Sequence, residues 1–374
     1  MFTNRLSRVA SFTMTMSSKT SKSFHNNSKK NTLKPAKHLN FYWFRHQDLR
    51  LHDNPALQNC IQSSKSNPNQ DGTNDGIIPF FCFDPRFVGT STTTPFGSSK
   101  CSVNRAQFLL ESVQNLRENL EQNGSGLVVA YGKTEEIMEK LYSSLDSDGD
   151  IDGMTLRPAV FCQTEIASEE LRVDKQMKRI LKQYDGRLES TWGSALYDID
   201  DLDDVFPNGG VYGIPDSFTP FRNKMEKKCK IGSPIPKPNK SNLALPTNPM
   251  VLEKFDGESD TLNAMPNCSL KYMPTLQDLG YSKEEITSVQ KPDSRGVMHF
   301  KGGETAALAR VQDYIFDKDR LKIYFDTRNG MLGADYSTKF SPWLAHGCLS
   351  PRFVAKECKR YEEETGIVNK STYW

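Results

Sequence analysis

A chain of 374 residues is longer than one hydrophobic core usually holds, which predicts two domains and excludes a single small one. Only 36% of the residues are hydrophobic and no apolar run reaches eighteen residues, which excludes a membrane-spanning helix. Residues 1–40 contain eight Lys or Arg and no acidic residue, so without them the net charge of +2 becomes −6. This balance excludes a general polyanion binder, and any nucleic-acid contact has to come from a local groove.

The N-terminal residues have the composition of a targeting segment. Residues 1–40 also hold seven Ser and five Thr, and they lack the apolar core of a secretory signal. A basic, hydroxyl-rich and acid-free composition is typical of an organelle transit peptide, which we assign to residues 1–39 with chloroplast and mitochondrion both open. A disordered basic tail is the alternative. The eight cysteines are dispersed without a C-x-x-C pair, which indicates buried thiols in a reducing compartment.

Short apolar runs separated by amphipathic stretches begin near residue 39. The runs predict buried strands at residues 41–44, 77–83, 127–131, 159–162 and 188–192. The stretches between them predict a helix that ends at Asn123, a helix that begins at Thr134 and a helix with Ser168 as its N-cap. Strands that alternate with helices predict an α/β fold with a doubly wound parallel sheet.

Stretches of a different composition interrupt this pattern and also follow it. Three stretches rich in Gly, Asn, Ser or Pro, at residues 63–76, 143–153 and 232–274, are predicted to be surface insertions or connectors. Helical patterns follow from residue 304 and from Pro351 to Glu364. We therefore expect an α/β domain at 40–195, a linker at 196–296 and a helical domain at 297–374. Roughly seventy-five residues bury little core alone, so we expect this helical domain to be incomplete.

Two motifs are excluded by their spacing. Five residues separate Gly126 from Gly132-Lys133-Thr134 where a phosphate-binding P-loop needs four, and those five residues are typical of a strand. The acidic residues 148–153 begin like a calcium loop, but Ala159 stands where the bidentate carboxylate is required. His46 and His52 have no spacing that forms a metal site, so we expect no bound metal.

Two segments carry candidate ligand-binding residues. Ser337, Thr338, Lys339 and Ser341 precede Pro342, so Ser341 can cap a helix and Pro342 can occupy its first turn. Hydroxyls, an ammonium and free backbone N–H groups are what a pyrophosphate needs, although Ser-Pro helix starts are common without a ligand. Glu165 directly follows a predicted strand, where doubly wound sheets place ligands, and a solvated loop carboxylate is the alternative.

Longer stretches of the chain carry a resemblance to a known family. Residues 41–57 (FYWFRHQDLRLHDNPAL) resemble the opening strand and turn of the photolyase/cryptochrome family. Residues 302–308 (GGETAAL) and 327–345 (TRNGMLGADYSTKFSPWLA) resemble its cryptochrome DASH branch. The similarity extends from about residue 39 to the last residue.

This resemblance implies two bound cofactors. In such proteins an α/β domain holds a light-harvesting antenna, usually a folate such as 5,10-methenyltetrahydrofolate, and a helical domain buries FAD. The resemblance implies that Ser337, Thr338, Lys339, Phe340 and Ser341 cradle the FAD phosphates, that Tyr324 also contacts FAD, and that Glu165 contacts the antenna. His346 departs from the pattern, because a smaller or apolar residue usually stands there.

The implied activity is light-driven DNA repair. Reduced FAD would pass an electron to a cyclobutane pyrimidine dimer, chiefly in single-stranded DNA, and split it. A blue-light photoreceptor that signals without repair, and a fragment without function, are the alternatives. Family members continue beyond a segment like residues 372–374 into the helices that hold the flavin ring and the catalytic residues. We therefore expect weak FAD retention in this chain, no membrane association and a monomer.

Overall fold

The computed structural model describes residues 36–66, 76–147, 155–206, 213–247, 251–252, 255, 267–290, 296–330 and 333–367. Residues 1–35 of the predicted transit peptide, the acidic residues 148–153 and residues 372–374 lie outside the described residues. No helix within the described ranges is both long enough and apolar enough to cross a membrane.

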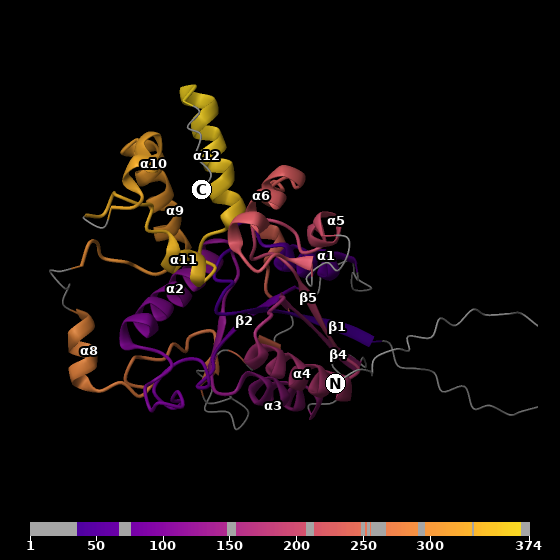
Figure 1. Ribbon diagram of the computed structural model, residues 1–374. Helices are drawn as coiled ribbons and strands as arrows, with labels where there is room; N and C mark the ends of the chain where they lie inside the picture. The colour runs from indigo at the N-terminus through magenta and orange to yellow at the C-terminus, as the bar shows by residue number, and fades with distance from the viewer. Residues whose placement is uncertain are drawn as a thin grey trace, which may run out of the picture. The chain divides into compact units, whose positions relative to one another are not determined.

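A six-stranded sheet lies at the centre of the described chain (Figure 1). Its order is β5-β4-β1-β2-β3-β6, and every neighbouring pair is parallel except β3 and β6. The chain starts at β1 in the middle, adds β2 and β3 on one side, and returns to add β4 and β5 on the other. This confirms the predicted doubly wound α/β sheet, with strands β1 (Ala36–Phe44), β2 (Ile78–Phe83), β3 (Val128–Tyr131), β4 (Thr155–Gln163), β5 (Arg187–Thr191) and β6 (Cys268–Ser269).

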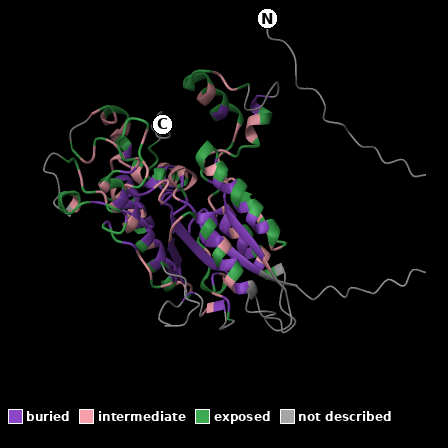
Figure 2. Cartoon of the chain, turned by 90° about the horizontal axis from the view of Figure 1, so that it is seen from below, coloured by how far each residue is buried: buried purple, intermediate pink, exposed green. Residues whose placement is uncertain are grey.

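Both faces of the sheet are buried because the strands alternate their side chains between two cores. Tyr42 and Phe44 belong to the core under helices α1 and α2, whereas Phe41 and Trp43 belong to the core under α3 and α4. Figure 2 shows the buried strands between helices whose outer faces are exposed. The four helices are α1 (Pro55–Ser66), α2 (Val103–Gln122), α3 (Thr134–Ser147) and α4 (Ser168–Gln183).

Parts of the stretch at residues 232–274, predicted to be a surface insertion or connector, belong to the core, which corrects that expectation for those residues. Strand β6 lies in this segment and pairs antiparallel with β3, at Val129 with Ser269 and Ala130 with Cys268. Leu243, also in this segment, is fully buried. The linker also contains helices α5 (Asp201–Val205), α6 (Phe218–Lys228) and α8 (Lys283–Gln290).

The C-terminal part of the described chain is helical. Helix α9 (Glu304–Gln312) runs into a π-helical turn at Asp313–Asp317, and α10 (Tyr324–Thr327), α11 (Ser341–Ala345) and α12 (Pro351–Thr365) follow. Two predicted N-caps are wrong by one residue, because Ser341 and Ser168 are the first helical residues after Phe340 and Ala167. Neither preceding residue offers a side-chain cap, so the first turns keep free N–H groups.

A buried polar hub at residues 50–54 joins the sheet to the helical part. Arg50, 1% exposed, donates to the carbonyl oxygens of His52, Asp53, Gly193 and Gly347 at 2.9–3.1 Å. Two carboxylates of the hub accept hydrogen bonds: Asp53 accepts from Ser350, Arg352 and Ile235, and Glu304 accepts from the backbone of Leu51 and His52. The sheet and the helices are therefore tied by groups that are costly to leave unpaired.

Candidate functional site

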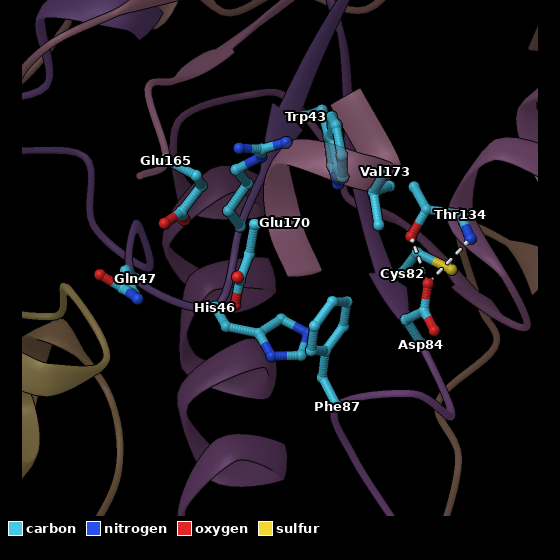
Figure 3. A pocket seen from close by; sticks show the side chains of 11 residues that line it. Trp43, His46, Gln47, Cys82, Asp84, Phe87, Thr134, Glu165, Glu170 and Val173 are labelled. Atoms are coloured by element: carbon cyan, nitrogen blue, oxygen red, sulfur yellow. Dashed lines mark hydrogen bonds between the residues drawn. The ribbon is translucent and has the colours of Figure 1, made fainter. Parts of the chain in front are cut away.

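The first candidate site is a cavity of about 50 Å³, here called the sheet cavity, at the carboxyl ends of β1, β2 and β4 (Figure 3). The chain crosses from one half of the sheet to the other between β1 and β4, which is where doubly wound folds bind ligands. The cavity is lined by Trp43, Arg45, His46, Gln47, Cys82, Asp84, Phe87, Thr134, Glu165, Glu170 and Val173.

Glu165 is the most unusual group in the sheet cavity. Its residue is 8% exposed, and its carboxylate makes no hydrogen bond or ion pair among the described residues. The pKa of Glu165 is raised to about 7, mainly by burial. Arg45 opposes this rise, and the nearby Glu170 and Asp174 add to it. A buried carboxylate without a partner is costly, so this group fits a ligand that offers N–H donors.

Two other pairs of polar groups in the sheet cavity satisfy each other, whereas Oε2 of Glu170 is buried without a hydrogen-bond partner among the described residues. The Arg45 guanidinium lies 4.1 Å from the centre of the Trp43 ring, and it is held there by an ion pair with Asp174. On the opposite wall Asp84 accepts hydrogen bonds from the backbone and hydroxyl of Thr134 at 3.1 and 3.2 Å. Figure 3 shows this pair across the cavity from Glu165. These side chains are positioned before any ligand arrives.

His46 completes the wall with a neutral ring. Burial lowers its pKa to about 4, and the ring centre lies 5.6 Å from Phe81 and 5.7 Å from Phe87. His346, the residue that departs from the family pattern, is 7% exposed and burial lowers its pKa to about 4 as well. Both rings are therefore uncharged at neutral pH.

The second candidate site is a cavity of about 250 Å³, here called the helical cavity, between α10, α11 and α12. Its lining is mostly apolar: Leu196, Ile315, Leu321, Tyr324, Thr338, Phe340, Leu344, Pro351, Val354, Ala355 and Cys358. The structure thus brings three of the sequence-predicted residues, Tyr324, Thr338 and Phe340, to one cavity. Ser337, Lys339 and Ser341 are not in the lining and lie in the same loop beside it.

The loop that carries these residues has an unusual number of free donors. Within the described residues, the side chains of Ser337, Thr338, Lys339 and Ser341 make no hydrogen bond or ion pair, and the N–H groups of Lys339, Phe340 and Ser341 have no acceptor. Lys339 has a φ of 58°, a left-handed conformation that lets successive N–H groups converge. Hydroxyls, N–H groups and an ammonium fit the diphosphate of FAD.

Arg310 is the functional candidate that sequence reasoning missed. It lies on α9, is 6% exposed, and donates to the carbonyl oxygens of Thr338 at 3.2 Å and Ala334 at 2.9 Å. The only signal in the sequence is one arginine in the otherwise uncharged stretch after Glu304, which does not reveal a contact with a loop more than twenty residues away.

A third cavity lies outside both sites. It measures about 310 Å³ between α5 and α6, and aromatic residues such as Trp192, Phe218 and Phe221 line it. None of the residues predicted from the sequence reaches this cavity.

Comparison with known proteins gives the molecule a family context. A model of the DNA photolyase family matches residues 40–239. Cryptochrome DASH, chloroplastic/mitochondrial, from Arabidopsis thaliana is 39% identical over 340 residues, which cover 90% of this chain and 50% of that protein. The corresponding protein of Ostreococcus tauri is 37% identical over 345 residues, which cover 89% of this chain and 56% of that protein.

Solved structures agree with the sequence comparison. The cryptochrome of Synechocystis sp. PCC6803 matches 91% of this chain and 59% of its own with a TM-score of 0.69 and 34% identity. The Sulfolobus tokodaii photolyase, described with two FAD molecules, shares the fold at a TM-score of 0.53 and 16% identity, covering 88% of this chain and 56% of its own. The chain spans about half the length of the curated relatives it matches.

Proposed function

The chain belongs to the DNA photolyase family, in its cryptochrome DASH branch, and from this premise we propose that it is the antenna- and FAD-phosphate-binding part of a photolyase-like flavoprotein. The family fold implies FAD binding. The intact activity we propose is blue-light-driven repair of cyclobutane pyrimidine dimers, chiefly in single-stranded DNA. When bound, FAD supplies the light absorption and the electron for that reaction.

One observation carries the FAD assignment. Ser337, Thr338, Lys339 and Ser341 place four unpartnered polar groups in one loop beside the helical cavity. We propose that this loop binds the FAD phosphates through the hydroxyls, the ammonium and the free N–H groups. Tyr324 and Phe340 line the apolar cavity next to the loop and would exclude water from the adjoining part of the cofactor.

For the sheet cavity we propose a folate antenna, 5,10-methenyltetrahydrofolate, with Glu165 as its acceptor. The pterin edge of a folate carries an amino group and a ring nitrogen that can both donate to an ionised carboxylate, whose two oxygens are acceptors. A flavin edge has one N–H between two carbonyl acceptors and complements a lone carboxylate poorly.

Replacing Glu165 tests the folate assignment. Glu165→Gln keeps the shape but removes the charged acceptor, so we expect roughly a tenfold loss of methenyltetrahydrofolate affinity, measured by fluorescence titration. The matched control is Glu169→Gln, because Glu169 lies one turn away and is exposed in a pair with Lys100. Equal affinity of the wild type and Glu165→Gln for methenyltetrahydrofolate would contradict the role of Glu165.

The organisation of the intact protein is also a proposal. We propose a transit peptide at 1–39 that leads to the chloroplast or mitochondrion, an α/β antenna domain at 40–195, a linker at 196–296 and the start of the FAD-binding domain at 297–374. The names of the plant relatives support the first of these. Fusion of residues 1–39 to a fluorescent protein tests it, and cytosolic fluorescence would contradict it.

The proposed role of residues 337–341, here called the phosphate loop, is tested by removing the hydroxyls of these residues. Ser337→Ala, Thr338→Val and Ser341→Ala together remove three donors worth about 1 kcal/mol each, so we expect roughly a hundredfold loss of ADP affinity by calorimetry. Thr219→Val, on the exposed surface of α6, is the control. An unchanged ADP affinity in the triple variant would contradict the cradle.

The proposed activity is tested by irradiating the protein with reduced FAD and a single-stranded oligonucleotide that contains a pyrimidine dimer. Loss of the dimer under blue light and none in the dark is the expected result. A light-induced change in flavin absorption without repair would favour the photoreceptor alternative.

A further inference from the structure

The strongest unassigned feature is the environment of Arg310. Its guanidinium forms ion pairs with Asp313 at 2.7 Å and Asp335 at 3.0 Å. Its Cζ atom lies 5.1 Å from the centre of the Tyr314 ring. Lys318 pairs with the same two carboxylates at 3.0 and 3.3 Å. Two cations and two anions thus neutralise one another at the junction of α9 and the π-helical turn.

Arg310 also donates hydrogen bonds to two backbone carbonyls in and just before the phosphate loop. Its Nη2 donates to the carbonyl of Ala334 at 2.9 Å, and its Nε donates to the carbonyl of Thr338 at 3.2 Å. A guanidinium offers its donors in a rigid planar fork, so these two carbonyls are held at a fixed separation and direction. A lysine ammonium has three donors but no planar fork, so it would not fix the separation and direction of the two carbonyls.

The direction of these carbonyls sets the direction of the N–H groups. In a trans peptide the C=O and the following N–H point to opposite sides, and no described peptide bond is cis. Because the Thr338 carbonyl points at Arg310, the Lys339 N–H points away from α9. That N–H is the first of the three free donors in the loop, and the left-handed Lys339 orients the next two.

We propose that Arg310 is a positioning residue for diphosphate binding: it does not touch the ligand, and it holds the loop so that the N–H groups of Lys339, Phe340 and Ser341 face the phosphates. The inference rests on the FAD-phosphate function proposed above. It names a residue from another element, α9, as the determinant of affinity for the phosphate part of the cofactor.

The test compares two ligands that differ only in the diphosphate. ADP and adenosine are titrated calorimetrically into the full chain, and the ratio of their affinities is the readout. Arg310→Lys keeps the positive charge and loses the fork, so we expect the ratio to fall roughly tenfold while adenosine affinity stays within twofold. General damage to the fold would lower both affinities together.

Asp335 and Asp313 provide a matched pair in case Arg310→Lys does not fold. Both carboxylates bind Arg310 and Lys318, but only Asp335 lies just before the phosphate loop. Asp335→Asn and Asp313→Asn add the same charge change, so electrostatics alone predicts equal effects. We expect Asp335→Asn to lower the ADP to adenosine ratio severalfold more than Asp313→Asn.

The outcomes separate this inference from the proposed function. A wild type that prefers ADP, with a ratio lowered by Arg310→Lys and by Asp335→Asn, supports both. A preference that survives these substitutions overturns the role of Arg310 and leaves the phosphate loop intact. A wild type that does not distinguish ADP from adenosine overturns the FAD-phosphate function, and the role of Arg310 with it.

Discussion

The two cavities differ in which of their polar groups have hydrogen-bond partners. In the sheet cavity several polar groups already have a partner, such as Arg45 with Asp174 and Thr134 with Asp84, whereas Glu165 and Oε2 of Glu170 have no hydrogen-bond partner among the described residues. In the helical cavity the lining is apolar and the polar groups of the adjoining loop lack partners together. The first site is built to select a small donor-rich ligand, and the second depends on its ligand to become satisfied.

The largest expected effect is a loss of stability at the buried polar hub of residues 50–54. Arg352→Met leaves the buried carboxylate of Asp53 without the bidentate partner that now lies at 2.8 and 2.9 Å. An uncompensated buried charge costs about 3–5 kcal/mol, measured as the loss of unfolding free energy in urea. The control is Lys359→Met on the same helix, whose exposed pair with Glu363 is worth less than about 1 kcal/mol. Equal losses in the two variants would contradict the hub.

A smaller effect of opposite sign is expected at Glu165. Its folded pKa of about 7 lies above the ordinary value of 4.5, so the folded state binds more protons and the wild type loses stability as pH rises from 4.5 to 7. Glu165→Gln is therefore expected to unfold with about 3 kcal/mol more free energy at pH 8, and with less than about 1 kcal/mol more at pH 5. Urea titrations at the two pH values measure the difference. A gain that is the same at both would show that ionisation is not its cause.

FAD retention tests the open character of the helical cavity. A cavity of about 250 Å³ lies below the usual ligand-pocket range of about 300–1,000 Å³, so much of the flavin ring would stay in water. We expect the purified chain to carry well under one equivalent of FAD in its absorption spectrum. One tightly bound equivalent of FAD would contradict the expectation that the helical cavity leaves much of the flavin ring in water.

The smallest expected effect separates stability from binding at Lys339. A side chain in the left-handed region costs about 1 kcal/mol that glycine avoids, so Lys339→Gly is expected to stabilise the chain by about that amount. The same variant loses an ammonium and is expected to bind ADP more weakly. Lys339→Ala, the control, loses the ammonium and keeps the strain. If urea titrations show that glycine and alanine give the same stability, the left-handed conformation carries no cost.

The sequence predicted what short-range patterns can determine. Apolar runs located five strands, and the spacing of Pro351 to Glu364 located α12, which ends at Thr365. Strand β6 was missed because two residues carry no alternation, and its pairing with β3 is decided by a neighbour more than a hundred residues away. Arg310 was missed for the same reason, since its partners at 334 and 338 are set by the fold of the loop.

For the candidate site, the residues were foreseen but their grouping was not. Glu165 was placed correctly at a strand end, yet its raised pKa results mainly from burial, with smaller contributions from Glu170 and Asp174 in the following helix. The resemblance named Tyr324, Thr338 and Phe340, and only the structure shows that they share a cavity while Ser337, Lys339 and Ser341 border it. Burial and pairing are three-dimensional quantities, so no sequence pattern reports them.

The hub at residues 50–54 also sets the order in which the newborn chain can mature. Asp53 and Ser350 are separated by 297 residues, so at roughly 5–20 residues per second the ribosome takes about 15–60 s to supply the partner of a loop it made early. During that interval Asp53 lacks its partners Ser350 and Arg352, and Arg50 lacks the carbonyl of Gly347. The α/β layer, although first to be synthesised, is therefore completed only when the last described helix has emerged.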